Sequence, residues 1–371
     1  MKKVIGLCNL HDDPHLGLLT DNRPCGAVTF LGRYGIIDFT LSNFSNSGIE
    51  KVYVLVKNGI LQMRNHIGNG SIWTNNTKTG FINLLINEKG LFSPKFNTDI
   101  ANIRLNLPVD EIDFEYAVIA PSFMLASIDY RPIVKAHTES KADISIVYSH
   151  LESTDEEFIN CDRLKIGKDN KVSKIETNFG RTKEADISLE SFIINKKALM
   201  KVLADSPKVS EMFNLRQMIN YYVNEEIMDI RAYEFKGYVV PMLDFDHYVK
   251  NSLELLNYHS RNKLFLEDWP IYTTTHNTPP TLYAKTADVK NSFIANGSVI
   301  KGKVENSILS REVLVEKGAV IKNSIIFTKS EIGKDVKLEY VVADKKVKIY
   351  TTKELSGSED KPLYIHQGAK I

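Results

Sequence analysis

Apolar residues in the first two thirds of the chain follow two different spacings. Short runs rich in β-branched and aromatic residues predict five strands, over residues 4–10, 51–57, 115–120, 143–149 and 229–235. Apolar positions at near-helical spacing predict three helices, over residues 36–47, 129–140 and 245–257. Strands and helices that alternate in this way indicate parallel βαβ units, so we expect an open α/β sheet.

A third pattern begins after a Thr- and Pro-rich stretch at residues 269–281, which favours an extended connector. Beyond it an apolar residue recurs at every sixth position: Ile308, Leu314, Val320, Ile326, Ile332 and Leu338. This period is typical of hexapeptide β-helices, in which the aliphatic residue points into the axis of a triangular coil. One rung buries little surface, so the rungs must stack.

The patterns together predict two domains in the 371 residues. We place the α/β domain at residues 1–257, a linker at 258–288 and the β-helix domain at 289–371.

Composition excludes several classes of protein. The net charge is +1 and no run of Lys or Arg stands out, which argues against a nucleic-acid partner. No stretch approaches the length of a membrane span. The three cysteines lie far apart and form no CxxC pair, so we predict neither a disulfide framework nor a zinc site. We expect a soluble, cytoplasmic protein.

One motif is long enough to indicate a family. Residues 23–49 read RPCGAVTFLGRYGIIDFTLSNFSNSGI, and this stretch resembles the one that follows the phosphate loop in ADP-glucose pyrophosphorylases (glucose-1-phosphate adenylyltransferases). The connector with Thr278-Pro279-Pro280 and the hexapeptide tail are similar too. The resemblance implies a Rossmann-like nucleotidyltransferase domain with a GT-A-like mixed sheet, followed by a left-handed parallel β-helix. The left hand is implied by the resemblance, because parallel crossovers are normally right-handed.

The features that carry catalysis in that family are missing here. Its glycine-rich phosphate loop matches residues 10–16, LHDDPHL, in which no glycine remains and two aspartates would repel a triphosphate. Its two metal-binding aspartates match Phe123 and Pro241, whose side chains offer Mg²⁺ no oxygen. The sequence therefore predicts no catalytic residue, no metal and no cofactor in this chain, and magnesium only in a catalytic partner.

Three further family positions have changed as well. The sugar-phosphate lysine maps near residues 176–178, where no lysine stands, and another family lysine is replaced by Cys25. The family's Gly-Thr-Ala-Asp-Ala segment finds no counterpart between Phe92 and Glu115. Because these sites are independent, ordinary catalysis by this chain is not expected.

Two arginines beside the motif are candidate ligands of an effector. Arg23 matches a family arginine that helps to bind allosteric anions, and Arg33 follows ten residues later. A guanidinium fork suits phosphate, although a salt bridge would use the same residue equally well. Other basic effector positions of the family are occupied here by Asn22, Thr29 and Gly35.

The resemblance implies a regulatory, non-catalytic subunit in glycogen biosynthesis. Its expected partner is a catalytic ADP-glucose pyrophosphorylase homologue that converts ATP and glucose 1-phosphate to ADP-glucose and pyrophosphate, in a heterotetramer that a small phosphorylated effector regulates. Two alternatives stay open. The chain is an adenylyltransferase with a rearranged site, for which Asp38 and Asp129 are the candidate carboxylates, or a module that senses sugar phosphates or nucleotides.

Overall fold

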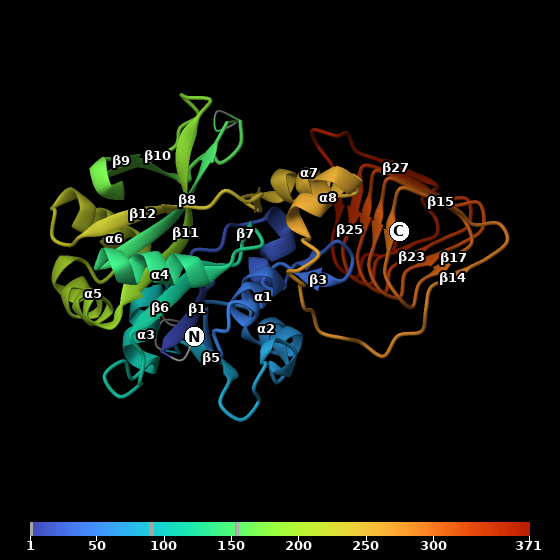
Figure 1. Ribbon diagram of the computed structural model, residues 1–371. Helices are drawn as coiled ribbons and strands as arrows, with labels where there is room; N and C mark the ends of the chain where they lie inside the picture. Colours follow the sequence, from blue (N-terminus) through green and yellow to red (C-terminus); the bar gives the residue numbers. More distant parts are fainter. Residues whose placement is uncertain (1–2, 89–92, 153, 155) are drawn as a thin grey trace. The chain divides into compact units, whose positions relative to one another are not determined.

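The structure is a computed structural model that describes residues 3–88, 93–152, 154 and 156–371 (Figure 1). It divides into two compact units, each built from several segments of the chain. The first unit consists of Met1–Asp13, Ile37–Val239 and Glu267–Tyr272, and the second unit consists of Pro14–Ile36, Val240–Leu266 and Thr273–Ile371.

A nine-stranded mixed sheet forms the centre of the first unit. Its path runs β10-β9-β11-β6-β1-β4-β5, and β8 joins β11 to β12. The strands are β1 (Val4–Asn9), β4 (Lys51–Val56), β5 (Phe81–Ile86), β6 (Tyr116–Pro121), β8 (Ile144–Leu151), β9 (Asp162–Ile166), β10 (Val172–Thr177), β11 (Ala185–Asn195) and β12 (Ile230–Glu234), with the short β7 (Met124–Leu125) outside the sheet. Strand β1 pairs in parallel with β4 and β6, whereas β11 is antiparallel to β6 and β8.

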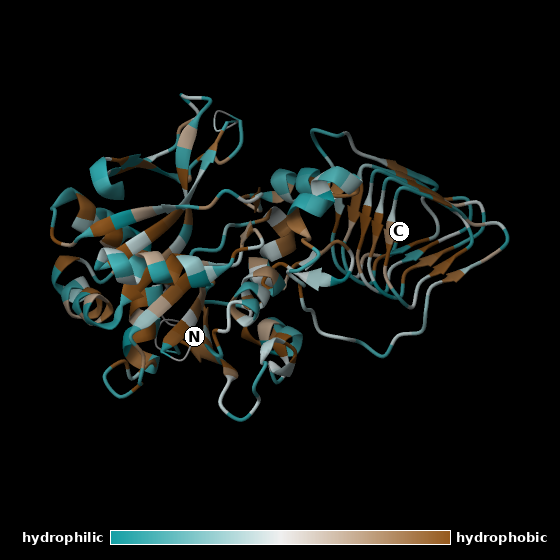
Figure 2. Cartoon of the chain, viewed as in Figure 1, coloured by the Kyte–Doolittle hydropathy of each residue, from teal (hydrophilic) through white to brown (hydrophobic). Residues whose placement is uncertain are grey.

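Six α-helices belong to the described part of the first unit: α1 (Asp38–Asn46), α2 (Ile60–Ile67), α3 (Asp99–Asn106), α4 (Tyr130–Ser140), α5 (Lys196–Val209) and α6 (Leu215–Asn224). Four of them begin at a side-chain cap, provided by Thr98, Asp129, Asn195 and Asn214. Helices α3, α5 and α6 pack on the sheet through one large apolar core, which Figure 2 shows as hydrophobic strands behind amphipathic helices. The predicted strands and helices are confirmed, with ends that differ by a few residues.

Three parallel sheets of five strands make the β-helix of the second unit. One contains β14 (Leu282–Tyr283), β17 (Val299–Ile300), β20 (Leu314–Val315), β23 (Glu331–Ile332) and β26 (Lys348–Ile349). The next contains β15 (Asp288–Lys290), β18 (Lys303–Glu305), β21 (Val320–Lys322), β24 (Lys337–Glu339) and β27 (Glu354–Ser356). The third contains β16 (Phe293–Ile294), β19 (Ile308–Leu309), β22 (Ile325–Ile326), β25 (Val341–Ala343) and β28 (Leu363–Ile365). This is the architecture that the resemblance implies.

The coil repeats every 17 residues over most of its length, because Ser307, Ser324 and Val341 occupy equivalent places on successive rungs. One side of each such rung is therefore a residue shorter than a hexapeptide. The corner residues Asn306 and Asn323 have φ of 46° and 47°, a left-handed conformation that asparagine tolerates well.

Because one side is short, only some of the residues predicted to point into the axis of the coil do so. Ile326, Ile332 and Leu338 lie in its buried core, as the six-residue period predicts. The prediction is wrong for Ile308, Leu314 and Val320, because the period loses one residue once per turn, here at the corner of Asn323. The core is filled there by the next residue along the chain in each case, Leu309, Val315 and Ile321.

The second unit also contains helices α7 (Phe245–Glu254) and α8 (Tyr258–Leu264), the hairpin strands β2 (Thr29–Phe30) and β3 (Tyr34–Gly35), and β13 (Val240–Pro241). Tyr248 of α7 stacks on Phe327 of the coil at 6.4 Å between ring centroids, and its hydroxyl donates to the carbonyl of Thr29. Helix α8 and strand β14 both lie in the stretch predicted as a linker, 258–288. The predicted domain boundaries, at residues 257 and 288, stay a prediction.

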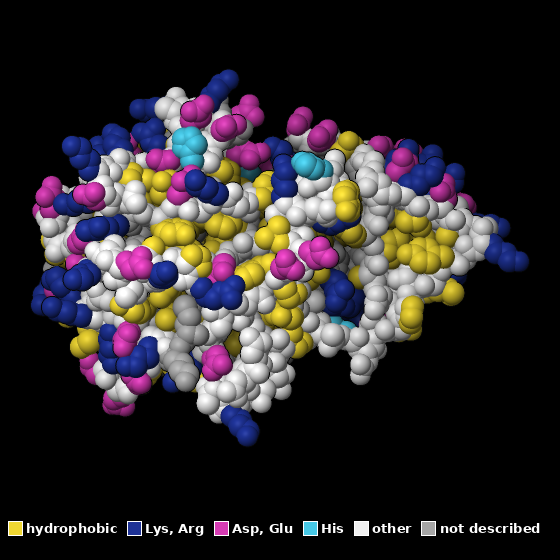
Figure 3. Space-filling view, in the orientation of Figure 1, with side chains coloured by type: hydrophobic (Ala, Val, Ile, Leu, Met, Phe, Trp, Pro, Cys, Tyr) yellow, Lys and Arg dark blue, Asp and Glu magenta, His cyan; other side chains and the backbone are white. Residues whose placement is uncertain are grey.

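None of the described helices is long and apolar enough to span a bilayer. Positive and negative side chains are intermixed over the face shown in Figure 3. The predicted cytoplasmic location and the predicted lack of a nucleic-acid partner are not tested by these observations.

The register of the coil can be tested by a pair of alanine substitutions. Ile321→Ala removes a fully buried side chain from the axis and is expected to destabilise the second unit by about 2–5 kcal/mol. Leu314→Ala, which removes an outward and only partly buried side chain, is expected to cost less than about 1 kcal/mol. Thermal unfolding of both variants measures the difference, and equal destabilisation would contradict the observed register.

Candidate functional site

The loop that follows β1 is tied down by its own side chains. His11 is buried, and the Asn102 amide donates to its Nε2 at 2.9 Å, which leaves Nδ1 to donate to the Asn97 carbonyl at 3.2 Å. Burial, together with the charge of Lys57, lowers the pKa of His11 to about 4, so the ring is neutral. The Lys57 ammonium donates to the carbonyl of His11 at 3.3 Å. The N–H groups of Leu10 and His11 are used inside the chain as well, by the carbonyl of Leu55 and by Oδ1 of Asn9.

A buried carboxylate occupies the N-termini of two helices beside this loop. Asp99 accepts hydrogen bonds from the N–H groups of Ile100 (2.7 Å) and Leu215 (2.9 Å), which begin α3 and α6, and from the side chain of Asn9 (2.8 Å). Helix N-termini attract anions, and here an internal anion already uses them. Burial and the nearby charge of Asp12 raise the pKa of Asp99 to about 7.

Asp12, from the loop itself, reaches the same helix end. Its carboxylate accepts a hydrogen bond of 2.7 Å from the side chain of Asn214, which caps α6. Burial raises the pKa of Asp12. Asp13 accepts a hydrogen bond of 2.8 Å from Ser122. Both aspartates that were predicted to repel a triphosphate therefore have partners inside the first unit.

A glutamate interrupts the apolar strand β11 at its bend. The register of β11 against β8 shifts between Ser188 and Ser191, and Glu190 between them has φ of 52°. This left-handed conformation is unfavourable for a residue with a side chain, and it turns the Glu190 side chain into the interior, where it is 8% exposed. Burial raises the pKa of Glu190 to about 8.

Arg216, in the first turn of α6, joins the buried acids. Its guanidinium makes two hydrogen bonds to Asp162, at 2.6 and 2.7 Å, and lies 3.1 Å from Glu190. Burial works to lower the pKa of Arg216, but the hydrogen bonds to Asp162 and the charge of Glu190 outweigh it and raise that pKa. We call Asp162, Glu190 and Arg216 the Arg216 network.

The two arginines predicted to bind an effector have different surroundings in the second unit. Arg23 is buried, its guanidinium is paired with Asp344, and its Nε donates to the carbonyl of Leu19 at 2.6 Å. Tyr364 donates a second hydrogen bond to Asp344, at 2.8 Å. Arg23 therefore holds the segment before the hairpin to the coil, and its predicted role toward an effector stays untested.

Arg33 is exposed and lines a small cavity of about 190 Å³. Its guanidinium lies over the ring of Tyr34, 5.5 Å from the centroid. Arg311 of the coil and Asn296 line the same cavity, together with His276 of the connector. Two guanidinium groups around so small a space suit a compact anion such as a phosphate.

Two protein families match segments of this chain. The nucleotidyl transferase family profile matches residues 15–158, and the GlmU-like C-terminal hexapeptide profile matches residues 281–361. Glucose-1-phosphate adenylyltransferase of Clostridium perfringens is 30% identical over 325 residues, which cover 85% of this chain and 82% of that protein. The chain belongs to the glucose-1-phosphate adenylyltransferase family.

Other members of the family are similar over more of the chain. Glucose-1-phosphate adenylyltransferase of Bacillus cereus is 30% identical over 334 residues, covering 88% of this chain and 87% of the relative. The glycogen biosynthesis protein GlgD of Bacillus subtilis is 29% identical over 360 residues, covering 94% and 91%. This chain is thus similar along nearly its whole length both to adenylyltransferases and to a protein that is not named as one.

The catalytic magnesium ion of the adenylyltransferases does not fit the residues present here. Phe123 of the first unit and Pro241 of the second, which the resemblance places at the family's metal-binding aspartates, are each buried and carry no side-chain oxygen. Ser122 donates to Asp13, and the carbonyl of Pro241 accepts from Asn251 at 2.6 Å. Within the described ranges, no group of three or more His, Cys, Asp or Glu side chains could hold a metal ion.

The sequence analysis did not identify Asp99, Glu190 or Arg216, which the structure places beside the loop after β1. Glu190 stands alone as a charged residue in the apolar run 187–194, and this was the signal that could have found it. Asp99 follows Thr98, the residue that caps α3. Both lie between Phe92 and Glu115, where the sequence showed no counterpart of the family's Gly-Thr-Ala-Asp-Ala segment. No pattern in the sequence around Arg216 indicates that it lies beside these acids, because the residues that it contacts are far from it along the chain.

The buried glutamate predicts a specific pH dependence. Because the pKa of Glu190 rises from 4.5 to about 8 on folding, the folded chain retains a proton that the unfolded chain has released. The free energy of unfolding is therefore expected to fall as the pH rises from about 5 to 8, by up to about 1.4 kcal/mol per pH unit from this group. Glu190→Gln should flatten that slope, with a smaller one from Asp99 remaining, in urea unfolding followed across this range.

Glu184→Gln is the matched control, because it removes an exposed glutamate that lies just before the same strand. Its slope should equal that of the parent chain. A Glu190→Gln variant with the same slope as the parent chain would show that Glu190 is ionised in the folded state.

Proposed function

We propose that this chain is a non-catalytic, regulatory subunit of glucose-1-phosphate adenylyltransferase that acts in glycogen biosynthesis. The observation that carries the proposal is the Arg216 network, which together with Asp12 and Asp99 places carboxylates and their partners around the loop after β1. The helix N–H groups and the guanidinium that could bind a phosphate there already contact Asp99, Asp162 and Glu190 of this chain, so a nucleotide triphosphate would find them occupied.

A catalytic homologue is the partner that fits this role. It would convert ATP and glucose 1-phosphate to ADP-glucose and pyrophosphate, and the present chain would alter its rate or its response to effectors. Support comes from the family itself, since its members similar to this chain include both named adenylyltransferases and the glycogen biosynthesis protein GlgD. We also propose that the two form a heterotetramer in the cytoplasm.

The cavity beside Arg33 and Arg311 suggests how an effector acts on the assembly. Both guanidinium groups belong to the second unit, and the cavity of about 190 Å³ has room for a small phosphorylated molecule. An effector that binds there would change catalysis only if its affinity differs between states of the assembly.

The alternative of a rearranged metal site finds no support in the carboxylates it requires. Asp38 is fully buried and its Oδ1 lies 2.5 Å from Nε2 of His66. Asp129 caps α4 and pairs with Arg131. Both carboxylates serve the local structure.

The proposal predicts a change in a partner's kinetics without activity of the chain's own. The isolated chain should form no ADP-glucose from ATP, glucose 1-phosphate and Mg²⁺. Added to a catalytic homologue from the same cell, it should change the rate or the effector concentration for half-maximal response by about fivefold or more. Bovine serum albumin at equal concentration is the control for non-specific stabilisation, and an unchanged partner would contradict the proposal.

A second prediction concerns the effector. The double variant Arg33→Gln, Arg311→Gln should leave assembly with the partner intact and reduce the response to a phosphorylated effector by about fivefold or more, because two phosphate-binding forks are lost. Arg64→Gln, which removes an exposed arginine of the first unit, is the matched control. If the double variant keeps the effector response of the parent chain, the effector does not bind in this cavity.

A further inference from the structure

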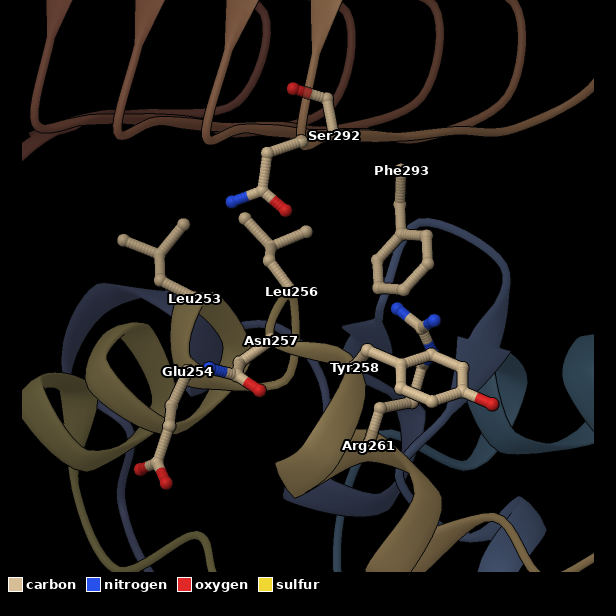
Figure 4. A pocket seen from close by; sticks show the side chains of 9 residues that line it. Leu253, Glu254, Leu256, Asn257, Tyr258, Arg261, Ser292 and Phe293 are labelled. Carbon is tan, nitrogen blue, oxygen red and sulfur yellow. The ribbon is translucent and has the colours of Figure 1, made fainter.

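A second and larger cavity lies within the second unit, between helices α7 and α8 and the first rungs of the coil. It has a volume of about 820 Å³, and its lining includes Leu253, Leu256, Tyr258, Arg261 and Phe293. These residues are separate from the cavity beside Arg33, except that Phe293 contributes to both. Figure 4 shows the two leucine side chains on one side and the two rings with the arginine on the other.

Arg261 is held between two aromatic rings. Its guanidinium carbon lies 5.4 Å from the centroid of the Tyr258 ring and 5.2 Å from that of the Phe293 ring. Figure 4 shows the guanidinium group in the space between the two rings. The two rings restrict the position of the guanidinium group, and its N–H groups are the atoms through which it can bind a further partner.

No carboxylate of the described residues accepts a hydrogen bond from the guanidinium N–H groups of Arg261. Arg131 makes a useful comparison, because it also lies over a ring, that of Trp269, yet it donates to Asp129 as well. The side chain of Arg261 has ring contacts but neither a hydrogen bond nor an ion pair with any described residue. A fixed guanidinium fork that faces a cavity without an internal acceptor is suited to an acceptor from outside.

We propose that this cavity binds a small organic monocarboxylate. A carboxylate matches the planar fork of Arg261 with two parallel hydrogen bonds. Glu254 is the other charged residue of the lining, so the cavity carries no surplus of positive charge for a dianion such as phosphate. Leu253 and Leu256 provide apolar surface for the body of the acid. The site is independent of the proposed function, since it shares no arginine with the effector cavity.

Titration of the full chain with 4-methylpentanoate tests the site, with methyl NMR spectra and calorimetry as the two readouts. We expect saturable binding with a dissociation constant on the order of millimolar and shifts of the Leu253 and Leu256 methyl signals. 4-Methylpentanamide, which has the same shape without the charge, should bind at least tenfold more weakly. Inorganic phosphate should also bind at least tenfold more weakly than the acid.

Arg261→Gln should weaken binding of the acid at least tenfold, whereas Lys263→Gln, which removes the same charge from the same helix outside the cavity, should leave it within twofold. Glu254→Gln should bind the acid at least as well and bind phosphate more tightly than the parent chain. If Arg261→Gln does not fold, Arg261→Lys replaces it, and the loss of the planar fork should weaken binding about threefold or more. The proposal is overturned if acid and amide bind equally, or if Arg261 variants retain the parent affinity.

Discussion

A buried carboxylate needs either a cation or a proton, and this requirement organises the first unit. Arg216 provides the cation for Asp162, Glu190 beside it retains a proton because burial raises its pKa to about 8, and helix N–H groups hold Asp99. The cost of removing one member of a buried ion pair is about 3–5 kcal/mol, because the other is left uncompensated. Loss of Arg216 alone is therefore expected to be strongly destabilising, because it would leave Asp162 buried without a cation. The network lies beside the loop after β1, where we propose that the same interactions keep out a triphosphate.

The sequence predicted those parts of the fold that repeat locally. The strands at 51–57 and 229–235 and the helix at 129–140 follow from spacing alone, because burial of one face imposes the period of the element. The coil was predicted as well, but not its register. Two rungs are one residue shorter, at Asn306 and at Asn323. A fixed period of six cannot predict these shortened rungs, since neighbouring apolar residues in the sequence could equally well point into the axis.

For the candidate site, the sequence predicts which family residues are lost, but it does not indicate which residues stand in their place. The family resemblance is enough to place Phe123 and Pro241 where aspartates are expected, because that comparison is made position by position. What fills the site depends on contacts between segments far apart in the chain, such as Arg216 with Asp162 and Glu190. Residue type alone also failed to separate Arg23 from Arg33. Burial distinguishes them, since Arg23 is paired with Asp344 inside the unit and Arg33 lines a cavity.

The second unit presents arginine in three different settings. Arg23 is satisfied by a carboxylate of the same unit, Arg33 shares a small cavity with Arg311, and Arg261 lies between two rings beside a larger cavity. An ion pair inside the unit stabilises the fold, whereas a guanidinium edge that faces a cavity is available to a ligand. The non-catalytic subunit that we propose would therefore have two places at which a small anion could bind.

The central claim is that carboxylates and their partners beside the β1 loop prevent this chain from binding a metal-bound nucleotide. Calorimetric titration of the isolated chain with MgATP measures this directly, with the Clostridium perfringens adenylyltransferase titrated alongside as the reference. The account predicts no saturable heat from this chain at millimolar nucleotide. Saturable, magnesium-dependent binding at submillimolar concentration, unaffected by Arg33→Gln with Arg311→Gln, would contradict it.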